Sequence, residues 1–228
     1  MPTGVHTVVD VIILSYTKNQ DLYDMTRKGI DSLNASEHKY KFNIVLVETD
    51  REHKWEWPDN VQSVLCDLPF NYNQALNKGS TLLGGAKQVI IANNDVLFTP
   101  GWYTNMVVAM QEYNLDSASP LTLGWHCHAD YDEDTVCFGF QTSYQFCGWC
   151  LVFERLALST VLPLDESFMF EYQDNDLALQ LQQRGYKHAL IGNAQVIHLL
   201  NQSHHLLTDE ERQKMIAQAH EVFDAKYR

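Results

Sequence analysis

Residues 8–14 of the chain, Val-Val-Asp-Val-Ile-Ile-Leu, are aliphatic at every position except Asp10. Such an apolar run is typical of a strand that is buried on both faces of a parallel sheet. A polar loop follows at 15–19, and from Asp21 onward apolar residues recur at helical spacing, with Asp21 as the predicted N-terminal cap. The segment therefore predicts a strand, a loop and a helix in succession.

The same pattern repeats through the first hundred residues. Apolar strands are expected at 42–47, 61–66 and 89–92, and a helix at 72–83 that ends at Gly84-Gly85. Alternating strands and helices predict a parallel α/β sheet whose ligands bind beyond the carboxyl ends of the strands. Three of those ends carry polar residues: 15–19, 48–50 and 93–95.

The second half reads differently. It predicts helices at 102–113 and 174–184, short strands at 188–191 and 195–198, and an aromatic stretch at 138–153. No linker or internal repeat divides the two halves, and 228 residues fit a single core. We therefore expect one domain over residues 1–228.

Charge and cysteine content restrict the class of protein further. The 29 acidic residues against 16 Lys and Arg give a net charge of -13, which repels polyanions at long range. No apolar run reaches the roughly 18 residues of a membrane span, and the N-terminus lacks the pattern of a signal peptide. The 5 cysteines cannot all pair within the chain. These features predict a soluble protein of the reducing cytoplasm.

Asn93-Asn94-Asp95 follows a predicted buried strand directly. One carboxylate with neighbouring amide oxygens suits a hard divalent cation such as Mg²⁺ or Mn²⁺, which also takes phosphate oxygens as ligands. A plain Asn-Asp turn after the strand is the alternative interpretation.

Acidic and aromatic residues crowd 165–176, at the entrance to the predicted helix. One interpretation is a helix N-terminus that is capped by Asp174 and favoured by the helix dipole. The other is a general base, because a carboxylate near aromatic surface can take a proton from a substrate hydroxyl. His198 ends an apolar strand and is either a surface residue or a third member of this site.

Several segments, taken in order, carry a resemblance. They are Val9–Tyr16, Ile44–Glu48, Tyr72–Gly79, Ile91–Val96 with Pro100–Trp102, Leu164–Phe168, Asp174–Leu177, Arg184–Tyr186 and Val196–His198. Together they resemble the inverting glycosyltransferases of family two, in their rhamnosyltransferase-like subgroup. The resemblance implies a GT-A fold: an α/β domain with a Rossmann-like, mostly parallel central sheet flanked by helices. It further implies a nucleotide-sugar-binding half at about 1–100 and an acceptor and catalytic-base half at about 101–228.

The resemblance also assigns roles. It implies that Asp95 and His198 bind the metal, Mn²⁺ or Mg²⁺, and that Asp174 is the catalytic base. The implied contacts to the donor nucleotide are Ser15, Tyr16, Thr17, Glu48, Asn93 and Asn94, with Glu48 at the nucleotide base. Trp149 and Asp176 are candidate acceptor contacts. Asn93, Asn94 and Gln173 replace acids found in many members, which leaves fewer charges on the metal and removes an acidic neighbour from Asp174.

The implied function is transfer of a sugar from a UDP-, GDP- or dTDP-linked donor to an acceptor hydroxyl, most simply on a glycan. The same chemistry on a hydroxymethylated base of bacteriophage DNA is an alternative. The expected location is the cytoplasm of a bacterium or, if the protein is phage-encoded, the cytoplasm of the host. DNA phosphates need Lys and Arg, however, and residues 88–154 contain neither. A catalytically silent relative that binds a nucleotide-sugar or a glycan is the other alternative.

A zinc site is a competing interpretation of the cysteines. Cys147 and Cys150 have the spacing of half a site, and His126-Cys127-His128 could supply the remainder. We expect Cys147–Cys150 instead to lie in a strand near the acceptor side, with Trp149 as the first aromatic to test as a sugar or base platform.

Overall fold

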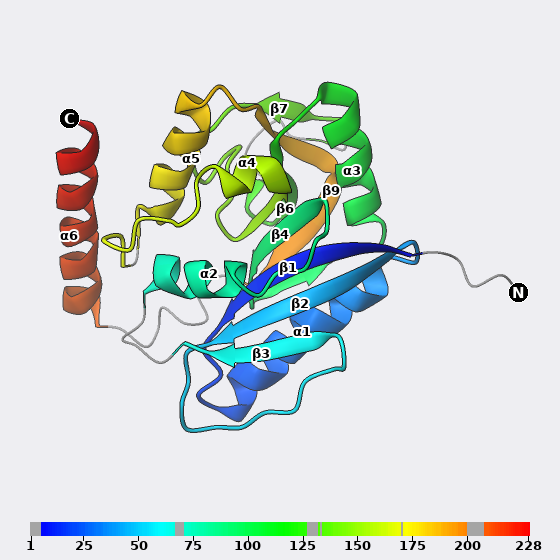
Figure 1. Ribbon diagram of the computed structural model, residues 1–228, viewed down its shortest axis with the longest axis horizontal. Coiled ribbons are helices and arrows are strands. Elements are labelled where there is room, and N and C mark those ends of the chain that lie inside the picture. The colour runs from blue at the N-terminus through cyan, green and yellow to red at the C-terminus, as the bar shows by residue number, and fades with distance from the viewer. Residues whose placement is uncertain (1–5, 67–70, 127–131, 133, 170, 200–207) are drawn as a thin grey trace, which may run out of the picture.

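The computed structural model describes residues 6–66, 71–126, 132, 134–169, 171–199 and 208–228 (Figure 1). Strands and helices alternate through the first half of the chain, as the apolar pattern predicts. In chain order the elements are β1 (Thr7–Ser15), α1 (Gln20–Ser36), β2 (Tyr40–Glu48), β3 (Val61–Leu65), α2 (Tyr72–Ser80), β4 (Gln88–Asn93), β5 (Val96–Phe98), α3 (Trp102–Tyr113), β6 (Ser117–Leu123), β7 (Val136–Phe138), β8 (Cys150–Glu154), α4 (Arg155–Ser159), α5 (Gln173–Gln183), β9 (His188–His198) and α6 (Asp209–Tyr227).

Within the described residues, nine strands form one sheet in the order β3-β2-β1-β4-β8-β6-β9-β5, and β7 pairs with β9. The strands β3, β2, β1 and β4 are parallel to one another. The next strand, β8, is antiparallel to both β4 and β6. β9 is parallel to β6 and antiparallel to β5. The sheet thus has a parallel N-terminal part and a mixed C-terminal part, in the α/β class expected.

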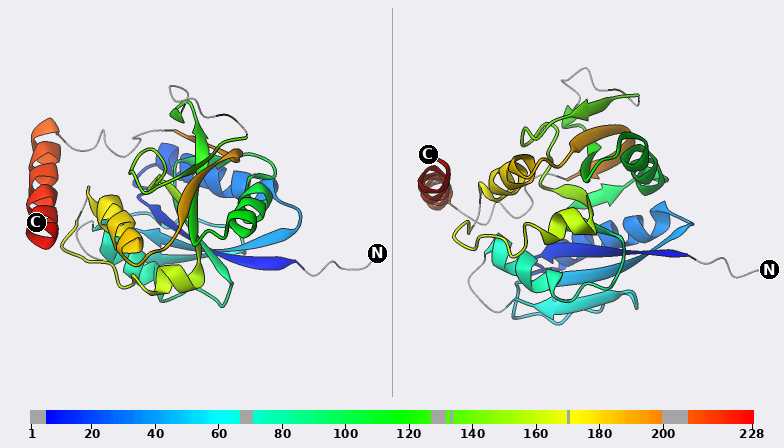
Figure 2. Two further views of the ribbon diagram at one scale, coloured as in Figure 1. Left: turned by 90° about the horizontal axis from the view of Figure 1, so that it is seen from above. Right: turned by 45° about the horizontal axis from the view of Figure 1, so that its top comes forward.

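Helices cover both faces of this sheet (Figure 2). Val9, Val11 and Ile13 of β1 belong to the core cluster that includes residues of α1 and α3. Ile12 and Leu14 belong to the opposite cluster, with residues of α2, α4 and α5. Burial on both sides is the physical reason that β1 shows no alternation of polar and apolar residues.

Asp10, the polar interruption in β1, is fully buried and has several partners. It forms an ion pair with Arg155, which comes from the start of α4, and accepts hydrogen bonds from the Asn43 amide at 3.0 Å and the Ala86 backbone N–H at 3.2 Å. A buried charge requires such partners. Asp10 therefore links β1 to β2, to the loop before β4 and to α4.

Three helix ends differ from the predictions. Asn19, not Asp21, caps α1, by accepting a hydrogen bond from the Leu22 N–H. α2 ends at Ser80 because the next residues form tighter turns, in which each backbone N–H binds a carbonyl three residues earlier. α5 begins at Gln173, so Asp174 lies inside the first turn and does not cap it.

Among the helices of the described residues, none combines the length and the apolar character that a membrane span requires.

Two strand predictions also change. Residues 188–198 form one strand, β9, instead of two, because a register shift between Pro120 and Leu121 of β6 lets the pairing continue. Residues 147–149 form a turn before β8 and not a strand, with the Cys150 N–H donating to the Cys147 carbonyl.

Candidate functional site

Asp95 and His198 are brought together by the pairing of β5 with β9. Val96 lies opposite His198 in this antiparallel ladder, and the Leu199 N–H donates to the Asp95 carbonyl at 2.9 Å. Asp95 Oδ1 lies 3.1 Å from His198 Nε2, and each side chain is only 9% exposed. The contact lacks hydrogen-bond geometry, and Asp95 Oδ1 and His198 Nδ1 have no hydrogen-bond partner among the residues described. Two buried polar groups therefore approach each other without satisfying each other.

This geometry fits a divalent metal. Adjacent ligands of an octahedral ion, each bound at about 2.0–2.1 Å, lie roughly 3 Å apart, close to the separation of the two side chains. A carboxylate oxygen with an imidazole nitrogen suits a transition metal such as Mn²⁺ better than Mg²⁺, which prefers oxygen alone. Within the described ranges, no group of three or more His, Cys, Asp or Glu residues is arranged to hold a metal ion. The described residues thus supply two ligands at this position, Asp95 and His198.

The two asparagines before Asp95 differ in their surroundings. The Asn94 side chain is buried and donates to the Thr26 hydroxyl on α1 at 2.8 Å. Helix α1 also lies against this turn at Gly29, where a Cβ would be 3.0 Å from the Val96 carbonyl oxygen. Asn94 thus anchors the turn to α1, and its expected contact to the donor stays a prediction. The Asn93 N–H donates to the Trp149 carbonyl at 2.9 Å.

Asp174 lies in the first turn of α5. Two consecutive residues with positive φ, Glu171 at 68° and Tyr172 at 58°, precede the helix, a backbone arrangement that costs energy in residues other than glycine. Burial raises the pKa of the Asp174 carboxyl, partly offset by hydrogen bonds from the Asn175 and Asp174 N–H groups, and the Glu171 charge raises it further. A raised pKa is expected of a general base that takes a proton near neutral pH.

Residues 148–149 lie between Asp174 and the Asp95–His198 pair. A Cβ at Gly148 would be 3.1 Å from Asp174 Cβ and 3.2 Å from its Oδ2, so the Gly148 backbone abuts the carboxylate. The next side chain, Trp149, stacks on the His198 ring with centroids 5.1 Å apart and planes inclined by 12°. The predicted base, Asp174, and the predicted metal ligand His198 thus both contact the segment Gly148–Trp149.

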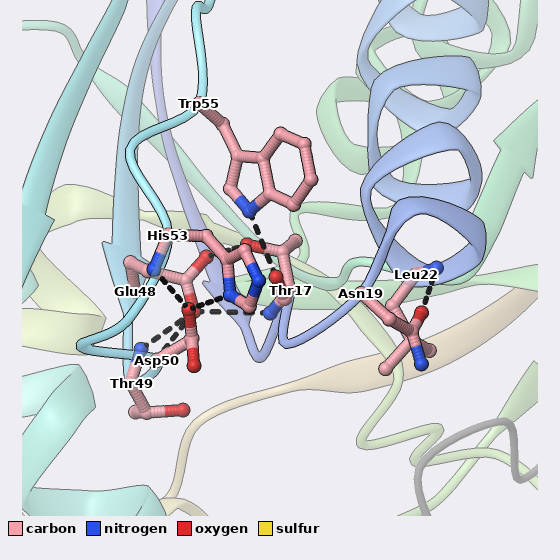
Figure 3. Close-up of polar contacts among 8 residues, drawn as sticks. All are labelled: Thr17, Asn19, Leu22, Glu48, Thr49, Asp50, His53 and Trp55. Atoms are coloured by element: carbon pink, nitrogen blue, oxygen red, sulfur yellow. Dashed lines mark hydrogen bonds and ion pairs between the residues drawn. The ribbon is translucent and has the colours of Figure 1, made fainter.

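At the sheet edge that was expected to bind the donor, Glu48 joins the loops after β1 and β2 (Figure 3). Its Oε1 accepts hydrogen bonds from the backbone N–H groups of Thr17, Thr49 and Asp50 at 3.1, 2.9 and 2.8 Å, and its Oε2 accepts the Thr17 hydroxyl at 2.6 Å. The residue is only 6% exposed, and its carboxylate is already used for these bonds. Glu48 therefore shapes the loops, and a direct contact to a nucleotide base would compete with four hydrogen bonds.

Ser15 and Tyr16 lie at the same edge of the sheet. Ser15 lies opposite Glu48 in the β1–β2 register, and its carbonyl accepts both the N–H and the hydroxyl of Thr49. Its own hydroxyl is buried without a hydrogen-bond partner in the described structure, a group that a ligand could satisfy. The Tyr16 ring lies 5.7 Å from Lys18 Nζ.

Three stacked aromatic rings lie beside these loops, and the sequence pattern did not predict them. Tyr23 stacks on Trp55 at 4.4 Å between centroids, and Trp55 stacks on His53 at 5.3 Å. The Trp55 indole N–H donates to the Thr17 carbonyl at 2.8 Å, and Asp50 binds both the backbone N–H and the ring of His53 (Figure 3). The signal was the run His-Lys-Trp-Glu-Trp at 53–57, directly after the polar end of β2.

Asp176, a candidate acceptor contact, is buried at the start of α5. Its side chain is 1% exposed and binds three groups: the Gln180 amide at 2.8 Å, the Tyr227 hydroxyl at 2.6 Å and Lys226 Nζ at 2.8 Å. Two of these three partners, Tyr227 and Lys226, belong to the C-terminal helix α6. The structure gives Asp176 a role in holding α6 against α5, and its role as an acceptor contact stays a prediction.

The candidate zinc ligands are only partly within the described residues. Cys147 Sγ lies 3.6 Å from His126 Nε2, whereas Cys127 and His128 lie outside the part described. Burial raises the thiol pKa of Cys147 and Cys150. Raised thiol pKa values disfavour the thiolate form that binds metals.

The chain matches no protein-family model, and it matches no curated protein in sequence. Its structure is similar to that of GalNAc-T7, crystallised with UDP, GalNAc and Mn²⁺, with a TM-score of 0.68 and 13% identity over 84% of this chain and 43% of that one. It is also similar to the 1–349 fragment of TarS from S. aureus, with a TM-score of 0.63 and 9% identity over 92% of this chain and 70% of that one. The chain spans less than half of the GalNAc-T7 chain. These similarities to glycosyltransferases confirm the GT-A fold expected from the sequence.

Proposed function

We propose that the chain is an inverting glycosyltransferase of family two that uses a divalent metal to transfer a sugar from a nucleoside diphosphate to a glycan hydroxyl. The observation that carries this proposal is the Asp95–His198 pair, which is buried, 3.1 Å apart and without mutual hydrogen-bond geometry. Its position after β4 is where open α/β sheets bind ligands. UDP and Mn²⁺ in the structure of GalNAc-T7, which has the same fold, support a UDP-linked donor; GDP- and dTDP-linked donors are also to be tested.

The proposed roles follow from the chemistry of transfer. Asp95 and His198 would hold the metal, which when bound neutralises the charge on a leaving diphosphate. Asp174 accepts the proton of the acceptor hydroxyl while that oxygen forms a bond to the anomeric carbon and the bond to the diphosphate oxygen breaks. A single in-line displacement inverts the anomeric configuration and needs no nucleophile from the protein. The Glu48-bonded loops would hold the nucleotide.

A glycan is preferred over DNA as the acceptor on grounds of charge. Residues 88–154, which include Asp95 and Trp149, contain no Lys or Arg that could bind phosphates. The test is a panel of nucleotide-sugars and glycan acceptors with Mn²⁺, in which release of nucleoside diphosphate is followed with and without EDTA. We expect release that stops on chelation and a product with inverted anomeric configuration by NMR. Absence of release across the panel would favour a binding module.

A further inference from the structure

Trp125 has a large exposed ring close to the candidate active site. Its side chain is 42% exposed and meets Trp149 edge to face, with centroids 5.4 Å apart and planes inclined by 68°. Trp149 in turn stacks on His198. Two ring contacts thus connect an exposed indole with one of the two proposed metal ligands.

Both indoles are held in place by their polar edges. The Trp125 Nε1–H donates to the Ser143 carbonyl at 2.9 Å, and the Trp149 Nε1–H donates to the Thr122 hydroxyl at 2.8 Å. Trp149 is partly buried and already stacks on His198, so the exposed indole of Trp125 is the ring that remains for contact with a ligand. A ring fixed in advance loses little conformational freedom on binding, which favours affinity.

Charge indicates what kind of ligand this surface accepts. Residues 88–154 and β9, which carry Trp125, Trp149 and His198, contain no Lys or Arg. Such a surface disfavours phosphate or carboxylate groups. The electron-rich face of an aromatic ring attracts partly positive C–H groups, which line one face of a pyranose ring.

We propose that Trp125, held against Trp149, forms a carbohydrate subsite that binds a neutral sugar unit of the acceptor by stacking. The subsite rests on the proposed function for its place in the reaction, since Trp149 lies between Trp125 and His198 and Trp125 would hold an acceptor unit one ring away from the metal site. Binding of the glycan itself needs neither donor nor metal, and so it can be measured separately from transfer.

The experiment uses the whole chain labelled with 5-fluorotryptophan, which gives five ¹⁹F signals for its 5 Trp residues. Trp125→Phe assigns the Trp125 signal. Maltopentaose, cellopentaose, chitopentaose and an anionic control, polygalacturonate oligomers, are titrated in without nucleotide or metal. We expect at least one neutral oligosaccharide to shift the Trp125 and Trp149 signals and to leave the signal of Trp102, which is fully buried, unchanged.

Variants then test the stacking directly. Trp125→Ala is expected to weaken binding of that oligosaccharide about tenfold or more, whereas Trp125→Phe, which keeps a ring, retains most of it. Phe138→Ala is the matched control, because Phe138 is 55% exposed and lies on β7. The proposal is overturned if no neutral oligosaccharide shifts Trp125, if only the anionic oligomers do, or if Trp125→Ala binds as the wild type does.

A parallel calorimetric titration with UDP and Mn²⁺ keeps the two proposals distinct. Nucleotide binding without a glycan-induced shift at Trp125 removes the subsite and leaves the glycosyltransferase. A shift at Trp125 in a protein that binds no nucleotide keeps the carbohydrate subsite and removes the transfer reaction.

Discussion

The Asp176 carboxylate accepts a hydrogen bond of 2.6 Å from the Tyr227 hydroxyl, although the two residues lie 51 positions apart. Lys226 Nζ lies 2.8 Å from the same carboxylate oxygen and 2.8 Å from Asp165. The last residues of α6 are thus fastened to the start of α5, two positions from Asp174. The C-terminal helix therefore supports the turn that carries the proposed base.

Tyr227→Phe is expected to destabilise this attachment by about 1–2 kcal/mol, because it removes one hydrogen bond to a buried carboxylate. Burial and the Asp176 charge raise the pKa of the Tyr227 hydroxyl, so it remains a donor over the working pH range. Thermal unfolding of the variant measures the loss. Tyr113→Phe, at a tyrosine that is 37% exposed, is the control and should unfold as the wild type does. Equal stability of all three proteins would contradict the attachment.

Arg155→Met should cost about 3 kcal/mol of folding free energy, since it leaves the buried Asp10 carboxylate without its ionic partner. The comparison is Arg27→Met, which breaks an i,i+4 pair with Asp31 in which both side chains are well exposed. That change should cost no more than about 0.5 kcal/mol. Urea unfolding of both variants gives the two values, and similar values for the two would show that Asp10 does not depend on Arg155.

The gathering of polar residues at one edge of the sheet could be predicted from local sequence pattern, for a reason visible in the sheet. Parallel strands end at the same edge, so Ser15 lies opposite Glu48, and Leu14 opposite Asn93. A run of polar residues after each apolar strand is therefore enough to predict that those residues gather there.

The direction of a side chain and the pairing of strands far apart in the sequence could not be predicted from such local patterns. Asp174 and Asp176 are two residues apart on one helix, yet one abuts Gly148 and the other binds α6. The approach of His198 to Asp95 depends on an antiparallel pairing between segments about a hundred residues apart, which no local period encodes. The resemblance to a known family supplied that pair, and the structure brings it together.

Asp95→Asn tests the metal site. An amide keeps the shape of the side chain but loses the negative charge that attracts a divalent cation, so the Mn²⁺ concentration for half-maximal nucleoside diphosphate release should rise about tenfold or more. His198→Gln should act in the same direction. Mn²⁺ binding followed by electron paramagnetic resonance checks this without turnover. Asp50→Asn, on the loop after β2, is the comparison and should leave Mn²⁺ binding unchanged.

Asp174→Asn should reduce transfer by about 10²- to 10⁴-fold and leave donor binding nearly intact, because the amide cannot accept the proton. In the wild type the base works only when it is deprotonated. Burial raises the pKa of Asp174, so kcat/KM should fall as the pH drops through this raised value, above the usual value of about 3.9. A pH profile of initial rates locates the fall. Turnover at the wild-type rate by the Asn variant would remove Asp174 from the role of base.

Gly148→Ala separates placement of Asp174 from stability of the fold. The new Cβ would lie 3.1 Å from Asp174 Cβ and 3.2 Å from Oδ2, so the carboxylate must move by a few tenths of an ångström. Because proton transfer depends on hydrogen-bond distance, we expect kcat to fall about tenfold or more, with little change in nucleotide affinity. Gly85→Ala is the matched control, since its Cβ would meet nothing within 4 Å. Steady-state kinetics and thermal unfolding of both variants are compared, and a Gly148→Ala enzyme with unchanged kcat would mean that Asp174 tolerates displacement or acts elsewhere.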